Sequence, residues 1–346
     1  MKFLIIKTSS LGDIVQSFSV LSYLKFRFPD CQIDWIVEAP FAELVRAHPH
    51  VNRTLCIRTK VWRKAPWNYI EEMRLFRKNL REIEYDVVFD LQGNVKSGLA
   101  TFQARSKHKV GFARGSVSEW PNILFTNHRY QLPPQQNIRE DYLFIVKSYF
   151  QDFSPFSSQG LSLNITPELQ RVTEKILTGL TPPIVMVCPG SAWRNKQMTE
   201  SALIDFLKLL QVKLQCHFLL IWGSEDEKKI AERIVQNLSQ HAQIVDRLPL
   251  PALQNLMNQV DLVVAMDSLP LHLAGTTSTP TFSVFGASSA RKYQPAGENH
   301  HALQGACPYG RTFDKRCPIL RSCATGNCIR ALTGLDVFKE FCNRHL

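Results

Sequence analysis

The residue best placed for chemistry near the start of the chain is Asp13. A short apolar run, Phe3 to Ile6, is typical of a buried strand, and the small polar loop after it ends where helical spacing begins. Loops at the carboxyl ends of strands line the ligand cleft of open α/β sheets. Position alone also fits helix capping, which contributes about 0.3–1 kcal/mol. Both interpretations of Asp13 stay open on this loop.

A second candidate site follows a later apolar run, which ends in Pro189-Gly190-Ser191 with Lys196 close behind. Glycine lets a ligand approach the backbone, Ser191 and the amides offer donors, and Lys196 adds a point charge. This combination can hold a diphosphate without a metal ion. The alternative is a plain strand-to-helix turn with an exposed lysine.

Two further loops have the same strand-to-helix character. Ser224 and Glu227 have the spacing of a capping box, although the carboxylate could also hold a ribose hydroxyl. Asp267 or Ser268 can cap the helix that Pro270 begins, or bind phosphates with the loop amides. His272 lies one turn into that helix, where a lone histidine is usually structural.

The stretch from Arg58 to Lys64 is basic and has Trp62 within it and Trp67 just beyond. Such a stretch could bind nucleic acid, or a carboxylated or phosphorylated glycolipid at a membrane surface. It could also be a solvated loop.

Nine cysteines, an odd number, occur in a chain where we find no export signal, so reduced thiols are expected rather than a disulfide framework. Four of them cluster in sequence at Cys307, Cys317, Cys323 and Cys328. The C-x-x-C pairs of common zinc sites are absent, so the spacing does not predict a metal site, and the role of the group stays open.

Alternating strands and helices must position these loops. In the first half we expect strands at 33–38, 51–57, 86–92 and 109–112, and helices at 41–47, 69–81 and 95–104. In the second half we expect strands at 183–188, 216–222, 243–246, 262–267 and 280–285, and helices at 199–213, 225–238, 250–259 and from 270. This alternation predicts two parallel sheets with helices on both faces and a cleft between two similar halves.

The polar stretch 153–160 predicts a linker between the halves. We therefore expect a first domain at 1–155, a second at 161–330, and a C-terminal helix at 331–346 that packs back on the first domain. No G-x-G-x-x-G follows the first strand, and no P-loop motif occurs, which disfavours a dinucleotide dehydrogenase or a P-loop NTPase.

The composition is that of an ordinary globular protein, with 346 residues, 45% hydrophobic and 21% charged. No stretch is apolar for long enough to cross a bilayer, and the N-terminal apolar run is too short for a secretory signal, so we expect a cytoplasmic protein. The net charge of +11 points to an anionic partner such as a nucleic acid, a phosphorylated small molecule or an acidic membrane surface.

Taken together, these loops resemble the heptosyltransferases of lipopolysaccharide core assembly, glycosyltransferase family 9, and most of all their heptosyltransferase I branch. The resemblance spans almost the whole chain. It is carried by Lys7-Thr8-Ser9-Ser10-Leu11-Gly12-Asp13, Asp34-Trp35-Ile36-Val37-Glu38, Trp62-Arg63-Lys64-Ala65, Gln92-Gly93-Asn94-Val95-Lys96-Ser97, Lys196, Trp222-Gly223-Ser224, and Asp267-Ser268-Leu269 with His272.

The resemblance implies a GT-B fold, in which one Rossmann-like domain binds the acceptor and the other binds the ADP-sugar. It implies that Asp13 is the general base and that Lys196 also takes part in catalysis. The implied donor-site residues are Ser191, Lys196, Glu227, Asp267, Ser268, Leu269 and His272, and the implied acceptor-site residues are Ser10, Gly12, Arg58, Lys60, Arg63, Lys64 and Gln92.

The implied reaction is a single inverting displacement that moves heptose from ADP-heptose to Kdo of lipid A. No cofactor is required; Mg²⁺ is compatible with the reaction but not implied. The implied setting is the inner face of the cytoplasmic membrane, with peripheral attachment and no nucleic-acid partner. Heptosyltransferase II, or another ADP-heptose transferase, is the alternative within the class. A non-catalytic nucleic-acid-binding protein is the alternative from a different class.

Overall fold

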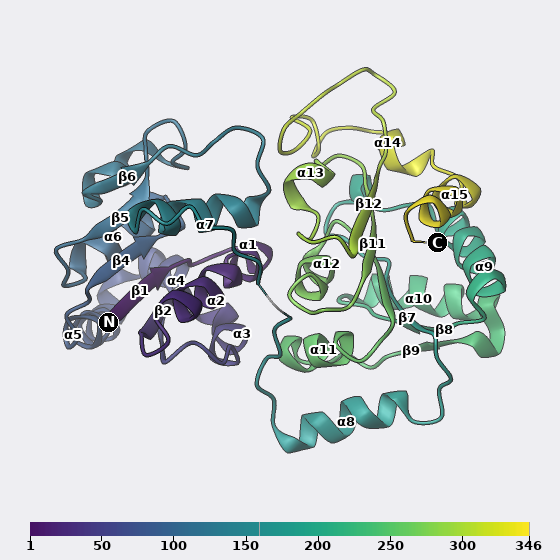
Figure 1. The fold of residues 1–346 in the computed structure, drawn as a ribbon, viewed down its shortest axis with the longest axis horizontal. Helices are drawn as coiled ribbons and strands as arrows, with labels where there is room; N and C mark the ends of the chain where they lie inside the picture. Colours follow the sequence, from purple (N-terminus) through teal and green to yellow (C-terminus); the bar gives the residue numbers. More distant parts are fainter. Residues whose placement is uncertain (159, 346) are drawn as a thin grey trace. The chain divides into compact units, whose positions relative to one another are not determined.

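The structure, a computed structural model, describes residues 1–158 and 160–345. Contacts between residues divide the chain into two compact units, Met1–Ser158 and Gln159–Leu346. Within the described residues each unit contains one six-stranded sheet in which every neighbouring pair of strands is parallel. Each sheet has helices along it, as Figure 1 shows.

The first unit is built on the sheet order β3-β2-β1-β4-β5-β6. Its strands are β1 (Lys2–Ile6), β2 (Gln32–Glu38), β3 (Arg53–Ile57), β4 (Val87–Asp90), β5 (Lys109–Phe112) and β6 (His128–Tyr130). Its helices are α1 (Leu11–Gln16), α2 (Phe18–Arg27), α3 (Ala42–Arg46), α4 (Thr59–Lys64), α5 (Ile70–Arg81), α6 (Val95–Gln103) and α7 (Ile138–Tyr149).

The second unit is built on the sheet order β12-β11-β10-β7-β8-β9. Its strands are β7 (Ile184–Cys188), β8 (His217–Leu220), β9 (Ala242–Ile244), β10 (Leu262–Met266), β11 (Thr281–Phe285) and β12 (His300–Gln304). Its helices are α8 (Pro167–Leu177), α9 (Glu200–Leu214), α10 (Glu225–Leu238), α11 (Leu250–Met257), α12 (Leu269–Ala274), α13 (Ala290–Tyr293), α14 (Asn327–Arg330) and α15 (Gly334–His345).

Both units follow the strand order of a Rossmann fold, since the third strand is followed in space by the second, first, fourth, fifth and sixth. The chain first adds strands on one side of β1 and then on the other side, beginning with β4. In the second unit the same change of side falls between β7 and β10. Ligands of open α/β sheets bind outside the carboxyl ends of the strands at this switch point. A ligand site is therefore expected at the loops after these four strands.

Burial explains why the central strands read as unbroken apolar runs. Every residue of β7, β10 and β11 is buried, because helices cover both faces of a parallel sheet. In the first unit Trp35 is fully buried in β2, and its indole N–H donates to the Lys7 carbonyl over 3.0 Å. That bond fixes the end of β1 immediately before the loop that carries Asp13.

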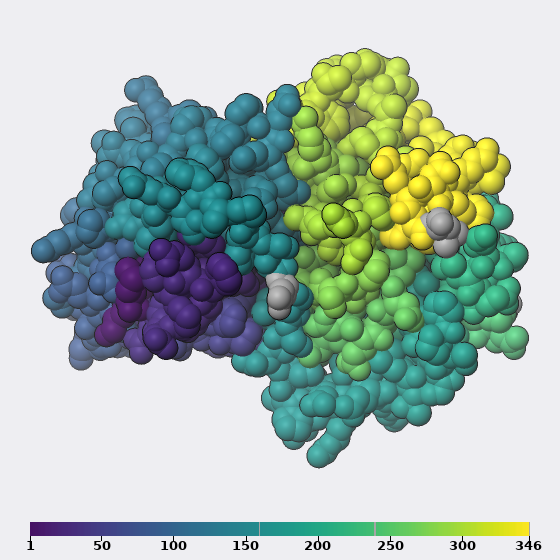
Figure 2. Space-filling view, in the orientation of Figure 1, coloured from purple at the N-terminus to yellow at the C-terminus, as the bar shows by residue number. Residues whose placement is uncertain are grey.

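The C-terminal helix forms as α15, but its packing partner differs from our expectation. It lies against α9 of the second unit, and Val337 and Phe341 are buried in that unit's core. The Phe341 and Phe206 rings are 6.2 Å apart between centroids. Figure 2 shows the yellow C-terminal residues over the teal surface of the same unit. Residues spaced by one helical turn give α15 an apolar stripe, and α9 buries it.

Candidate active site

The loops after β7 and β10 meet at the switch point of the second sheet. Ser191 follows β7, and its hydroxyl donates to the Asp267 carbonyl over 3.1 Å. Asp267 follows β10, the strand paired with β7. Two sequence-predicted residues from loops 76 positions apart are thus in direct contact.

Lys196 reaches this junction from a single turn of 3-10 helix, Arg194–Lys196. Its ammonium group forms an ion pair with one Asp267 carboxylate oxygen, and the Ser288 hydroxyl donates to the same oxygen. His272 Nε2 lies 3.6 Å from the other oxygen. Lys196, Asp267 and His272 are each buried. The structure therefore gathers a lysine, a carboxylate and an imidazole at the strand ends.

The charges in this cluster determine the protonation of Asp267. Burial alone raises the pKa of a carboxyl, but the positive charges of Lys196 and His272 and the hydrogen bond from Ser288 outweigh it. The pKa of Asp267 consequently lies below its ordinary value. Asp267 is ionised at neutral pH and holds Lys196 in a fixed position.

Glu227 approaches the same loops from the first turn of α10. A Cβ added to Gly190 would lie 2.2 Å from a Glu227 carboxylate oxygen, so any larger residue there requires Glu227 to move. The carboxylate accepts from the Gly223 amide over 2.8 Å, and the Glu227 amide donates to the Ser224 hydroxyl over 3.3 Å. One of the two hydrogen bonds of the predicted capping box is therefore confirmed, the one that the Ser224 hydroxyl accepts. The carboxylate itself caps the amide of Gly223 and lies against the loop after β7.

Ser268 and Leu269 mark the start of α12. Ser268 is the N-terminal capping residue by position, but its hydroxyl donates to the Met266 carbonyl over 3.3 Å and makes no cap bond. Leu269 is the first helical residue and is half-buried. Both residues therefore sit beside Asp267, in the loop that the sequence singled out.

In the first unit Asp13 is bound to Ser10. One Asp13 oxygen accepts from the Ser10 hydroxyl over 2.6 Å and from the Ser10 amide over 3.1 Å. These bonds are part of a capping box at the start of α1, and Gly12 is the second residue of that helix. The capping interpretation of Asp13 is confirmed, and capping also fixes the carboxylate at a half-buried position at the end of β1.

Gln92 organises the same loop from β4, the other strand at the switch point. Its side-chain oxygen accepts from the Thr8 amide over 3.0 Å and from the Ser9 amide over 3.1 Å. Asp90 is fully buried and accepts from the Gln92 amide over 3.0 Å. Gln92 thus supports the backbone that carries Ser10 and Asp13.

The basic stretch is helical rather than a loop. Lys60, Arg63 and Lys64 are exposed on α4, and Arg58 is exposed at its start and forms an ion pair with Glu72 over 3.3 Å. Trp62 turns the other way and packs on Phe76, with 5.8 Å between ring centroids. Of the alternatives left open, a loop is contradicted because the stretch forms α4, which Trp62 anchors to the core, although its cationic side chains are solvated.

Sequence reasoning missed three groups at these sites. Ser288 follows β11 and could have been found as another strand-end hydroxyl. Asp90 could have been found in the same way, as the last residue of β4. Lys7 is buried at the end of β1, and burial lowers its pKa while the charges of Asp13 and Asp90 oppose that shift. No local pattern distinguishes this lysine from a surface lysine.

A second, mainly basic surface lies on α5, where four exposed cationic side chains and the exposed carboxylate of Glu82 line one hollow; the cations are Arg74, Arg77, Lys78 and Arg81. Throughout residues 1–158 and 160–345, no helix combines the length and the apolar character needed to cross a bilayer.

Comparison with known proteins assigns the chain to a class. The family model described as glycosyltransferase family 9 (heptosyltransferase) matches residues 73–322. The chain belongs to this family and is a glycosyltransferase. Its two parallel six-stranded sheets are those of a GT-B fold.

Individual relatives agree with the assignment. The chain is 27% identical over 321 residues to lipopolysaccharide heptosyltransferase 1 of Pseudomonas aeruginosa, covering 92% of this chain and 87% of that protein. It is 25% identical over 304 residues to the protein of the same name from Escherichia coli K12, covering 86% and 92%. The structure of E. coli heptosyltransferase WaaC with ADP superposes with a TM-score of 0.78 at 23% identity over 99% of both chains.

Proposed function

We propose that this enzyme transfers heptose from ADP-heptose to Kdo of lipid A during lipopolysaccharide core synthesis. Support for the donor comes from its family and from relatives named lipopolysaccharide heptosyltransferase 1. The observation that carries the proposal is the buried cluster of Lys196, Asp267 and His272 at the switch point of the second sheet. Burying such a cluster costs free energy, and binding an anionic ligand at the carboxyl ends of the strands is a function that accounts for it.

Lys196 is the group that stabilises the leaving diphosphate in this proposal. Negative charge develops on ADP as the bond to the heptose breaks, and a fixed positive charge in a poorly solvated site stabilises it strongly. The amides at the start of α12 add hydrogen-bond donors, and Ser191 adds another once its hydroxyl turns from the Asp267 carbonyl to the ligand. With this charge supplied by the protein, the proposed reaction requires no Mg²⁺.

Asp13 is the proposed general base. The bonds from Ser10 hold its carboxylate at the carboxyl end of β1. A carboxylate is a weak base towards an alcohol, so proton transfer comes late, as the hydroxyl bonds to an oxocarbenium-like carbon and becomes acidic. The acceptor hydroxyl attacks the anomeric carbon opposite the departing ADP, and the configuration is inverted.

The anionic acceptor is proposed to meet the exposed cations of Arg58, Lys60, Arg63 and Lys64. We further propose that the protein attaches peripherally to the inner face of the cytoplasmic membrane, where the basic surface of α5 adds attraction to anionic lipid. Each basic residue near such a surface contributes about 1 kcal/mol.

The test is ADP release from ADP-heptose with a panel of acceptors. Kdo-lipid A should support turnover, whereas heptosylated Kdo-lipid A should support turnover only in a heptosyltransferase II. We expect Asp13→Ala to lower the rate about 10²–10⁴-fold, the usual loss for a general base. Asp30→Ala, which changes an exposed aspartate of the same unit, is the matched control. Normal turnover by a folded Asp13→Ala variant would exclude Asp13 as the base.

A metal requirement is tested separately. Adding Mg²⁺, or adding EDTA shortly before the assay, should leave the initial rate unchanged. A rate that depends on added Mg²⁺ would contradict the proposal that Lys196 and the loop amides suffice. Retention on DNA or RNA with no ADP release from any acceptor would favour the nucleic-acid-binding alternative.

A further inference from the structure

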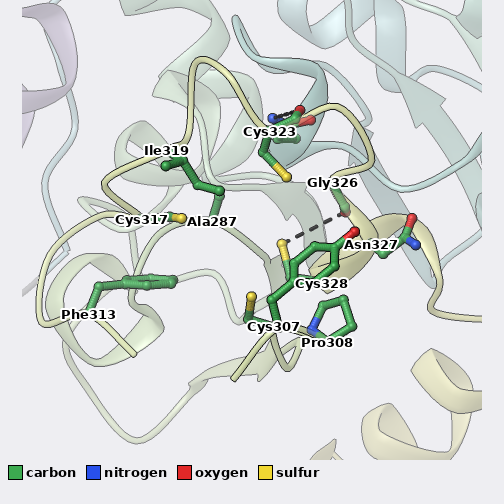
Figure 3. Close-up of a pocket in the computed structure, with 12 residues that line it drawn as sticks. Ala287, Cys307, Pro308, Phe313, Cys317, Ile319, Cys323, Gly326, Asn327 and Cys328 are labelled. Atoms are coloured by element: carbon green, nitrogen blue, oxygen red, sulfur yellow. Dashed lines mark hydrogen bonds between the residues drawn. The ribbon is translucent and has the colours of Figure 1, made fainter. Parts of the chain in front are cut away.

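The four clustered cysteines surround a single pocket in the second unit. Cys307, Cys317, Cys323 and Cys328 all line it, although the first and the last are 21 positions apart in sequence. Figure 3 shows the four side chains arranged around one space, together with Pro308, Phe313 and Ile319. The sequence spacing had argued against a metal site, but the fold brings all four thiols to one place.

Two of the cysteines begin matching turns. In Cys307-Pro308-Tyr309-Gly310 and in Cys323-Ala324-Thr325-Gly326 the fourth residue is a glycine with a left-handed φ, +66° and +62°. In the second turn the Cys323 sulfur lies 3.9 Å from the Thr325 hydroxyl oxygen, within hydrogen-bonding distance for sulfur. Polar groups hydrogen-bonded to the sulfur are a common outer shell of metal-bound cysteine.

The surrounding charge also suits a cluster of thiolates. The segment that carries them contains Arg311, Lys315, Arg316 and Arg321 with only Asp314 in opposition. A divalent cation held by four thiolates has a net charge of −2, which this excess of positive charge compensates.

We propose that Cys307, Cys317, Cys323 and Cys328 form a four-thiolate site for one soft metal cation, Zn²⁺ or iron. Four cysteine ligands in a tetrahedral arrangement are characteristic of these metals. Binding releases four protons, one from each thiol, and leaves the oxidation states of sulfur and metal unchanged.

The thiols have to move inward to bind the metal. Within the described residues, no three His, Cys, Asp or Glu side chains already stand close enough to hold an ion. The chain between β12 and α14 contains no helix or strand, and its β-type pairing is an isolated bridge between Arg316 and Ser288. Side-chain rotation and small loop shifts can therefore bring the sulfurs together without breaking a sheet or a helix.

The site would brace the loops around Lys196 and Asp267. The Asn195 side-chain amide donates to the Leu320 carbonyl over 2.8 Å and to the Cys323 carbonyl over 3.0 Å. The Cys317 amide donates to the Ala287 carbonyl over 2.8 Å, one residue before Ser288. Metal binding is therefore expected to order the cysteine-bearing segment, which contacts the loop of Lys196 through Asn195 and the loop of Ser288 through Ala287. We infer a structural role for the ion.

The experiment measures metal content directly. Full-length protein without a metal-binding tag is purified under reducing conditions and analysed for zinc and iron by mass spectrometry. We expect about one metal ion per chain, since four thiolates bind one tetrahedral ion. In protein refolded with Co²⁺, we expect the intense ligand-field bands of tetrahedral cobalt thiolate. The identity of the bound metal separates zinc from iron.

Variants locate the ion. Cys323→Ser and Cys328→Ser should each lower the metal content at least severalfold, whereas Cys56→Ser, in the first unit, should leave it unchanged. Circular dichroism checks that each variant is folded, and a variant that fails to fold is replaced by Cys307→Ser or Cys317→Ser. Folded variants that keep the wild-type metal content would overturn the proposal. Wild-type protein without zinc or iron, or with these cysteines paired as disulfides, would also overturn it.

Activity gives a separate readout, which rests on the proposed function. Loss of metal should lower ADP release through the loops around Lys196, whereas metal content is measured whether or not transfer occurs. Absence of transfer from a metal-loaded protein would therefore count against the proposed function and leave the metal site standing.

Discussion

Lys196 and Asp267 form an ion pair in which the two side chains are only 8% and 4% exposed. Removing two charges from water is costly, and a buried ion pair often contributes little net stability. The second unit retains this pair at the carboxyl ends of its central strands, where the fold places ligands. The proposed donor site gives this ion pair a role that net stability alone does not give it.

Removing one partner of this pair should be costly for the fold. Lys196→Ala leaves the Asp267 carboxylate buried without its counter-charge, which destabilises a protein by about 3–5 kcal/mol. Asp267→Ala leaves the ammonium group in the same condition. The double variant should lose less stability than the sum of the two single variants. Urea unfolding of the four proteins completes the cycle.

Additive losses in that cycle would show that the two charges do not interact. Activity supplies the second readout, because Lys196 also carries the proposed catalytic charge. The double variant should regain stability but not the rate of ADP release. Recovery of the rate would remove Lys196 from the chemistry.

A side chain at Gly190 should disturb Glu227. A Cβ there would collide with the Glu227 carboxylate, so Gly190→Ala must displace Glu227 or the loop after β7. Overpacking of this kind typically costs about 1–3 kcal/mol. We expect the KM for the donor to rise about tenfold, an effect equivalent to about 1.4 kcal/mol. Gly223→Ala is a graded comparison, because its added carbon would lie 3.2 Å from the same Glu227 carboxylate rather than 2.2 Å, so it should raise the KM less. A wild-type KM for Gly190→Ala would separate Glu227 from donor binding.

The sequence predicted the elements around both switch points because buried parallel strands read as apolar runs with small residues after them. Strand β5 was predicted with its observed limits, as was helix α10. Strands β6 and β12 were missed because they are edge strands, half-exposed and without a continuous apolar run. Their hydrogen bonds to β5 and β11 come from tertiary structure, which local patterns do not encode.

The site was predictable where a residue follows a strand, and unpredictable where long-range contact creates it. Asp13 and Asp267 could be found from their position alone. The contact of Ser288 with Asp267 depends on the packing of two strands, and the pocket formed by the cysteines depends on a segment with no regular structure. The sequence grouped the four cysteines by position, but their spacing along the chain could not show that the four thiols line one pocket.

Gln92 should affect activity by positioning the loop that carries Asp13 rather than by contacting the reacting atoms. Gln92→Ala removes the acceptor for the Thr8 and Ser9 amides, which are part-buried, so the loss is at most the roughly 1–3 kcal/mol that a fully buried unpaired donor costs. The loop that holds Asp13 should loosen, and kcat should fall more than donor affinity. Gln92→Glu keeps an oxygen for both amides and should restore most of the rate. Equal rates for the Ala and Glu variants would contradict this positioning role.

His48 should make the first unit sensitive to acid. It packs on Phe18, with 4.7 Å between ring centroids, and its burial, helped by the charge of His50, lowers its pKa to about 3. In the unfolded chain the His48 imidazole has its ordinary pKa of about 6.5. Between about pH 3 and about pH 6.5 the unfolded state therefore binds a proton that the folded state does not, and stability falls as pH falls. By about pH 5 the loss from this group is about 2 kcal/mol.

Hydrogen exchange of the β1 and β2 amides measures this loss in the first unit. His48→Asn should flatten the pH dependence between about pH 5 and about pH 7 compared with the wild type. An identical pH dependence in the two proteins would mean that His48 is not a source of acid sensitivity.

The basic helix α4 should control the response of the acceptor to salt. Arg63 and Lys64 are exposed, so their attraction for an anionic acceptor is screened over about 8 Å at physiological ionic strength. Arg63→Glu with Lys64→Glu should raise the KM for Kdo-lipid A at least tenfold and weaken its dependence on salt, because attraction has been replaced by repulsion. The KM for ADP-heptose should stay within about twofold, because mutating a peripheral charge acts mainly on the partner it faces. Lys208→Glu with Lys213→Glu, on α9 of the second unit, makes the same charge change away from this helix. If both double variants raise the acceptor KM equally, net charge governs acceptor binding and α4 has no specific part in it.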